Sequence, residues 1–191
     1  MNEMATVKYR VTGLGPMLQH NSRLANPMNE YTKAIKKISS KRKKTEEDHE
    51  EMARLEYMGS LYHDKKMGVY IPAGHWMAGL VEGAKKSKLG KAFKSAITCF
   101  ESTPLTFDGP KNPEQRWKAG GSFIDQRMAK VQQSRVLRTR PLFDNWSAIV
   151  EFQYDKTLVD KEQIDEAMTV FGSQVGLCDY RPMFGRFEVK K

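Results

Sequence analysis

The chain has few cysteines, no metal-binding pattern and no long apolar run. Its 191 residues include two cysteines, Cys99 and Cys178, which lie far apart in the sequence and lack the spacing of a zinc site. The four histidines show no ligand spacing either, so we expect neither a metal nor a cofactor. No segment approaches the ~20 consecutive apolar residues of a membrane-spanning helix. The first eight residues also lack the apolar core of a signal peptide. These absences predict a cytoplasmic protein with free, buried thiols and no membrane contact.

Sequence motifs of common catalytic sites are also missing. Ser22, Ser60 and Ser122 lie outside any nucleophile-elbow pattern, and the chain has no glycine-rich phosphate loop of the Walker type. No pair of a general acid and a general base can be identified from spacing. We therefore assign no catalytic residue.

The chain carries an excess of positive charge. It contains 32 lysines and arginines against 23 aspartates and glutamates, which gives a formal net charge of +9 and a pI near 9.5. Such an excess favours a polyanionic partner, nucleic acid first and an anionic membrane surface second. The alternative is a protein whose basic character only aids solubility.

The hydrophobic pattern predicts an α+β fold in a single domain, residues 1–191. Helical spacing of apolar residues predicts helices at 74–87 and from Asp160 to Gly172 or Gly176. Alternating or short apolar segments predict strands at 4–13, at 96–107 with a bend at Pro104, at 136–141, at 147–154 and at 184–189. The core order is β-α-β followed by β-α-β, which is typical of a ferredoxin-like sandwich, the fold of the RNA-recognition motif.

Two insertions interrupt this core. Residues 28–64 are predicted to form a helical hairpin, whose second helix begins with the capping-box layout of Thr45 and Asp48. Seven of the twelve residues 33–44 are basic. They either bind phosphate or form a solvated surface that compensates the negative charge at the start of the second helix. Residues 109–140 form a basic loop or hairpin insertion, with eight basic residues against two acidic ones.

Two glycine-containing motifs occur where core strands begin or end. The first runs Tyr70-Ile71-Pro72-Ala73-Gly74-His75-Trp76-Met77-Ala78-Gly79-Leu80, and the second runs Gly172…Gly176…Arg181…Gly185-Arg186-Phe187. They resemble the strand-to-helix signature and the glycine-rich loop of the RAMP superfamily of CRISPR proteins, and with the insertions the resemblance covers about half the chain. In the first motif Ala73 precedes the glycine, and His75 and Trp76 replace the usual pair of serines. The resemblance implies an RNA-recognition-motif-like fold, binding of single-stranded nucleic acid and filamentous self-assembly. It does not distinguish a CRISPR system from a phage or another mobile element.

Candidate nucleic-acid contacts lie in the loop after the first strand, in the two motifs and in the basic insertion. They are His20, Asn21, Arg23, Gly74, His75, Lys85, Arg116, Arg127, Lys130, Arg135, Arg138, Arg181 and Arg186. In the basic insertion the cations alternate with Trp117 and Phe123, and Phe143 and Trp146 follow, a mixture used to bind phosphates and stack bases. The alternative places the rings in the core, which we expect for Trp146. We also expect the turn at 72–76 and the loop at 181–186 to converge and flank one bound strand.

These features predict a non-catalytic protein that coats single-stranded RNA or DNA as repeated copies, in a homo-oligomer or a multi-subunit ribonucleoprotein. The alternative is a metal-independent endoribonuclease of the same superfamily, in which His20 acts in general acid–base catalysis with Tyr31, His63 or His75 nearby. A structural protein of a mobile element is a third reading.

Overall fold

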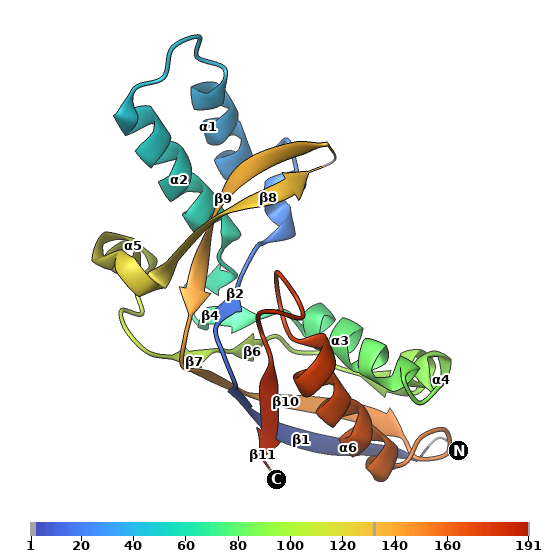
Figure 1. Ribbon diagram of the computed structural model, residues 1–191. Coiled ribbons are helices and arrows are strands. Elements are labelled where there is room, and N and C mark those ends of the chain that lie inside the picture. The colour runs from blue at the N-terminus through green and yellow to red at the C-terminus, as the bar shows by residue number, and fades with distance from the viewer. Residues whose placement is uncertain (1–2, 132, 191) are drawn as a thin grey trace. The chain divides into compact units, whose positions relative to one another are not determined.

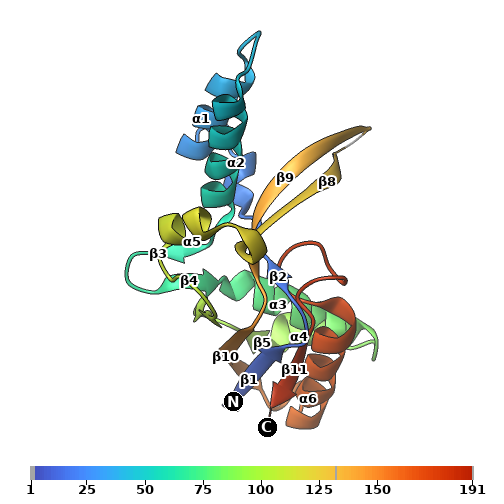
Figure 2. The ribbon, with the colours of Figure 1, turned by 60° about the vertical axis from the view of Figure 1, so that its left-hand side comes forward.

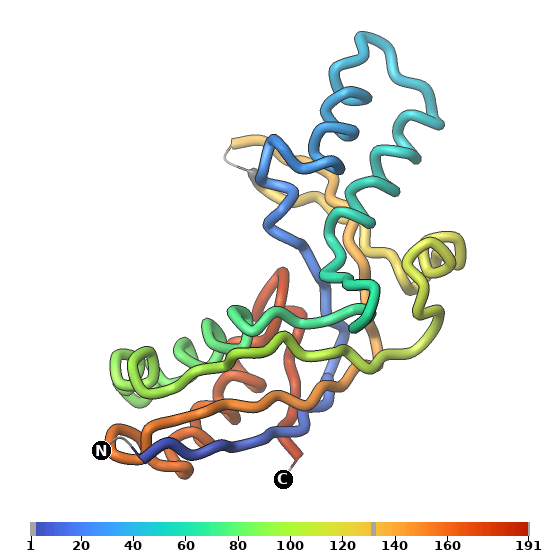
Figure 3. The backbone as a smooth tube through the Cα atoms, turned by 180° about the vertical axis from the view of Figure 1, so that it is seen from behind, coloured from blue at the N-terminus to red at the C-terminus, as the bar shows by residue number. Residues whose placement is uncertain are grey.

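The computed structural model describes residues 3–131 and 133–190, and the chain divides into two compact units. Unit 1 consists of Met1–Met17, His63–Asp108 and Phe143–Lys191, and unit 2 consists of Leu18–Tyr62 and Gly109–Leu142. The chain therefore leaves unit 1 twice and returns twice, a path that can be followed in Figure 3. The two predicted insertions thus belong largely to the same unit, which the sequence did not indicate.

An open antiparallel sheet forms the centre of unit 1. Its strands are β1 (Met4–Gly13), β5 (Ile97–Thr98), β7 (Thr106–Phe107), β10 (Trp146–Asp155) and β11 (Phe187–Lys190). Their order is β11-β1-β10-β5, and β7 pairs with β10 as well (Figure 1). The predicted strands at 4–13, 147–154 and 184–189 are therefore confirmed, and so is the α+β class.

Alternation along the central strands gives this sheet one buried and one open face. In β1, Val7, Tyr9 and Val11 are buried while Lys8 and Arg10 are exposed. Helices α3 (Ala73–Lys85) and α6 (Lys161–Val170) lie side by side (Figure 2) and cover the buried face.

Aromatic rings fill the space between the helices and the sheet of unit 1. Trp76 of α3 meets Phe187 of β11, with ring centroids 6.1 Å apart. Phe171 continues α6 into a π-helical turn, Phe171–Val175, and packs edge-on against Phe187 at 4.9 Å. The helices approach closely at Gly79, where an added Cβ would lie 2.0 Å from the Phe171 ring. Trp146 is also buried, as expected.

The single bent strand predicted at 96–107 is wrong. Helix α4 (Gly90–Ala96) occupies the residues before it, and the rest forms three two-residue strands. Strand β5 pairs with β10, β6 (Thr103–Pro104) pairs with β4 (Gly68–Ile71), and β7 returns to β10. The small second sheet is completed by β3 (His63–Asp64). The chain changes sheets at these points, which local periodicity does not reveal.

Unit 2 contains the predicted helical hairpin and a long β-hairpin. Its helices are η1 (Ser22–Ala25), α1 (Glu30–Ser39), α2 (Glu46–Ser60), α5 (Pro113–Ala119) and η2 (Gly121–Phe123). Strands β8 (Ile124–Val131) and β9 (Ser134–Phe143) form the β-hairpin, and short β2 (Met17–Leu18) pairs with β9. The predicted strand at 136–141 is thus part of β9, whereas α5 was not expected.

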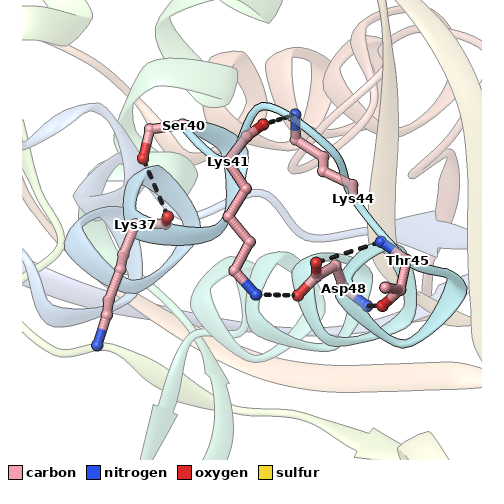
Figure 4. Close-up of polar contacts among 6 residues, drawn as sticks. All are labelled: Lys37, Ser40, Lys41, Lys44, Thr45 and Asp48. Atoms are coloured by element: carbon pink, nitrogen blue, oxygen red, sulfur yellow. Dashed lines mark hydrogen bonds and ion pairs between the residues drawn. The ribbon is translucent and has the colours of Figure 1, made fainter.

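The start of α2 has the predicted capping box. Thr45 Oγ1 accepts the Asp48 backbone N–H at 3.3 Å, and Asp48 Oδ2 accepts the Thr45 backbone N–H at 3.2 Å (Figure 4). Lys41 from the basic turn forms an ion pair with Asp48 at 2.5 Å, and the Lys44 ammonium donates to the Lys41 carbonyl. Part of the basic segment 33–44 therefore pairs with the acidic start of α2, which is one of the two alternatives predicted from the sequence.

Within residues 3–131 and 133–190, no helix is both long enough and apolar enough to cross a bilayer.

Candidate nucleic-acid interface

The positive charge of the chain is concentrated in unit 2. Unit 2 has 17 basic residues against 9 acidic ones, whereas unit 1 has 15 against 14. Most of the net charge of +9 therefore belongs to the part of the chain formed by the helical hairpin, α5 and the β-hairpin. Because a charge excess attracts polyanions over several ångströms, unit 2 is the candidate for the nucleic-acid interface.

Strand register assigns the hairpin side chains to two faces. Because side chains alternate along a strand, the pairs Lys130–Arg135, Met128–Leu137 and Gln126–Thr139 share one face. We call this surface the Lys130 face. The opposite face carries the pairs Arg127–Arg138 and Asp125–Arg140.

The hairpin contains two cross-strand pairs of like charge, Arg127–Arg138 and Lys130–Arg135. The two pairs differ in their surroundings. Arg127 is paired with Asp125, and Arg138 donates to the Glu56 carboxylate at 2.7 Å. Glu56 is nearly buried and also accepts the Thr139 backbone N–H at 2.8 Å. Arg127 and Arg138, both predicted to contact nucleic acid, thus already have acidic partners.

Lys130 and Arg135 have no such compensation. Both are exposed, and across the described part of the chain neither side chain forms a hydrogen bond or an ion pair. Like charges directly opposite each other in a sheet are destabilising. An anion bound between them would remove this repulsion.

Exposed apolar side chains follow on the same face. Met128 and Leu137 are 52% and 53% exposed and stand opposite each other in the register. Neither residue is among the contacts predicted from the sequence. The signal that could have found them is the period-2 alternation of the two strands, which places them between the cationic pair and the base of the hairpin.

The loop predicted to hold His20, Asn21 and Arg23 as ligand contacts instead closes the end of α2. The Arg23 guanidinium donates to the carbonyls of Met58, Gly59 and Leu61 at 2.8–2.9 Å. Cations and donors are favourable at a helix C-terminus because its last carbonyls have no partner within the helix. Arg23 thus has a structural role at the end of α2, and its contact with nucleic acid stays a prediction.

The neighbours of Arg23 take part in the same local structure. Asn21 caps η1 by accepting the Arg23 backbone N–H, and its amide donates to the Leu61 carbonyl. His20 Nδ1 lies 3.2 Å from Ser60 Oγ. His63 and His75, considered as catalytic partners for His20, belong to unit 1. The contacts with the end of α2 explain the polar character of the loop, and binding of nucleic acid by His20 and Asn21 stays a prediction.

The burial of Arg116 contradicts its predicted contact with nucleic acid. Arg116 is only 2% exposed, donates to the Leu142 carbonyl at 2.7 Å and lies 4.3 Å from the centroid of the Phe123 ring. Trp117 beside it is half-buried and packs on Tyr57 with centroids 5.3 Å apart. Arg116 thus anchors α5, and its guanidinium is out of reach of a strand on the surface.

In unit 1 the turn at 72–76 contacts the segment just before the loop at 181–186. His75 Nδ1 lies 3.6 Å from Cys178 Sγ. The predicted convergence with the loop at 181–186 itself stays a prediction. Burial first, and then the charge of Arg181, lower the pKa of His75, so the ring is neutral at pH 7. Burial raises the pKa of the Cys178 thiol to about 12. The pair is therefore a neutral contact, with no charge to offer a phosphate.

The other residues of unit 1 that were predicted to contact nucleic acid differ in their surroundings. Lys85 forms an ion pair with Glu82 at 2.5 Å, and Arg186 Nε donates to the Pro182 carbonyl at 2.9 Å. Gly74 is exposed with open space beside it, and Arg181 is exposed. Across the described residues, no three His, Cys, Asp or Glu side chains are placed to hold a metal ion.

Comparison with models of known protein families and with curated proteins finds no match to this chain.

Proposed function

We propose that this protein binds single-stranded nucleic acid, RNA in preference to DNA, and that the Lys130 face of unit 2 makes the contact. The observation that carries the proposal is the exposed, uncompensated pair of Lys130 and Arg135, next to the exposed pair of Met128 and Leu137. The concentration of positive charge in unit 2 supports it.

Each part of the face has a separate task in this proposal. Lys130 and Arg135 neutralise phosphates and release counterions, which supplies affinity without sequence preference. Met128 and Leu137 offer an apolar surface to the flat faces of unstacked bases, which a duplex keeps covered. The face therefore selects a single strand over a duplex, because only the single strand presents phosphates and bases together.

We further propose that unit 1 has the ferredoxin-like arrangement of the RAMP superfamily and that repeated copies coat the strand. Support comes from the chain order β1-α3-β5-β10-α6-β11, which is β-α-β-β-α-β, with β1 and β10 paired at the centre. The convergence of the two glycine-containing motifs at His75 and Cys178 is also in line with the resemblance.

Fluorescence anisotropy tests the binding. Labelled oligouridine of about 15 nucleotides, the same length of oligothymidine and a duplex are titrated at several salt concentrations. We expect tightest binding to the RNA strand, weakest binding to the duplex, and affinity that falls steeply with salt. Absence of binding at low salt, or a preference for the duplex, contradicts the proposal. Binding to a strand about three times longer, followed by light scattering, measures how many copies assemble on it.

A further inference from the structure

A pocket of about 430 Å³ opens between α2, α5 and the β-hairpin, all within unit 2. Apolar side chains on its wall include Trp117, Met52 and Leu137, and the polar ones include Glu50, Glu56 and Gln126. Leu137 belongs both to this pocket and to the Lys130 face. The pocket is thus the continuation of that face toward the base of the hairpin.

The lining of the pocket is unusual for a basic unit, since among the described residues it contains no lysine or arginine. Two carboxylates, Glu50 and Glu56, would repel a phosphate, so the pocket does not suit the backbone of a nucleic acid. A ligand that fits must be uncharged, present a flat apolar face to Trp117 and offer hydrogen-bond donors to the carboxylates. These are the properties of a nucleobase.

The acceptors in the pocket are arranged to discriminate between bases. Glu56 is held in place by Arg138 and the Thr139 N–H. The Gln126 amide nitrogen donates to Thr139 Oγ1 at 3.3 Å. Glu50 is exposed and, in the described part of the chain, its carboxylate has no hydrogen bond or ion pair. Its carboxylate is therefore the acceptor available to a ligand, and guanine is the base whose N1–H and N2–H₂ present two adjacent donors to it.

We propose that the pocket takes one guanine of the bound strand, with Glu50 as the residue that recognises it. This inference rests on the proposed binding of a single strand and adds a base preference to it. Along the hairpin, the cationic pair and the pair Gln126–Thr139 at the pocket are four residue positions apart, about 13 Å at the rise of a strand. A strand whose phosphates lie at Lys130 and Arg135 can therefore place a neighbouring base in the pocket.

Trp117 supplies an optical signal for occupation of the pocket. Of the three tryptophans, Trp76 and Trp146 are buried in unit 1, whereas Trp117 is half-buried and lines the pocket. A base that stacks on its ring should quench its fluorescence. The signal comes from the intact chain and needs no label.

The experiment compares an all-uridine strand with strands of the same length that carry one central guanine, adenine or cytosine. We expect the guanine strand to bind about tenfold more tightly than the all-uridine strand, the size of one good bidentate contact to a base. It should also quench tryptophan fluorescence. In Glu50→Gln the ratio of the two affinities should fall close to one, because the amide presents a donor to the donors of guanine. Glu46→Gln removes the same charge from an exposed position of α2 outside the pocket lining and should keep the ratio.

Each outcome has a defined meaning. Equal affinity for all four strands overturns the guanine pocket and leaves the proposed function intact, and so does an unchanged ratio in Glu50→Gln. An equal gain from adenine or cytosine overturns the choice of base. If no strand binds, the proposed function fails and this inference fails with it.

Discussion

Neutralising the cationic pair at the end of the hairpin should weaken binding without weakening the fold. In Lys130→Gln/Arg135→Gln two phosphate contacts are lost. For a single strand, each contact contributes about 0.7 to the slope of log affinity against log salt, so the slope should become shallower by about 1.4. Between 50 and 200 mM salt the variant should then lose ~7-fold less affinity than the unmodified protein.

The same substitution should leave the free energy of unfolding unchanged or raise it. Lys130 and Arg135 stand directly opposite each other without an acidic partner among the described residues. Cross-strand pairs are worth roughly 0.2–1 kcal/mol, and like charges act against stability. Removing the repulsion should therefore stabilise the hairpin by up to about 1 kcal/mol. Chemical denaturation followed by circular dichroism measures this change.

A matched control separates this site from net charge. Lys91→Gln/Lys94→Gln removes the same two charges from α4 in unit 1, where both lysines are exposed. This variant should keep the salt slope of the unmodified protein. If both double variants change the slope equally, attraction is by overall charge and the reasoning about the hairpin is refuted. It is also refuted if Lys130→Gln/Arg135→Gln binds with an unchanged slope.

Three further predictions concern the architecture. Thr45→Ala should lower the free energy of unfolding by about 1 kcal/mol, because it removes the N-cap of α2, and Thr45→Ser should restore it. Arg116→Met should cost about 2 kcal/mol, since the Leu142 carbonyl loses a charged donor, while binding per folded molecule stays unchanged. The lowered pKa of His75 means that the folded state favours the neutral ring. The contribution of His75 to the free energy of unfolding should be complete above about pH 6.5, the ordinary pKa of a histidine. It should be lost as the pH falls through the lower pKa that His75 has in the folded protein. His75→Asn should flatten that part of the profile of melting temperature against pH.

The results that would contradict these three predictions are different for each. For Thr45, an alanine variant as stable as the unmodified chain would show that the capping box contributes nothing. For Arg116, weaker binding by a variant that is still folded would restore its predicted contact with nucleic acid. For His75, an unchanged loss of stability below pH 6.5 in the asparagine variant would assign the acid sensitivity to other groups.

Local patterns in the sequence determined the two central strands of unit 1 and the starts of two helices. The alternation in residues 4–13 and 147–154 predicted β1 and β10, because one buried face imposes a period of two on each strand. The capping residues Thr45 and Asp160 marked the starts of α2 and α6, because unpaired N–H groups at a helix start need a local acceptor. These signals act over a few residues, so they can be read without knowing the fold.

The role of each cation was decided only by the tertiary structure. In the sequence, Arg23 and Arg116 resemble Lys130 and Arg135, since all four are basic residues in polar segments. Folding brings carbonyl groups distant in sequence to the first two, such as Met58 for Arg23 and Leu142 for Arg116. It leaves Lys130 and Arg135 opposite each other with neither acid nor carbonyl in reach among the described residues. Whether a charge stabilises the fold or is available to a ligand depends on its partners in space, and contacts between distant segments fix those partners.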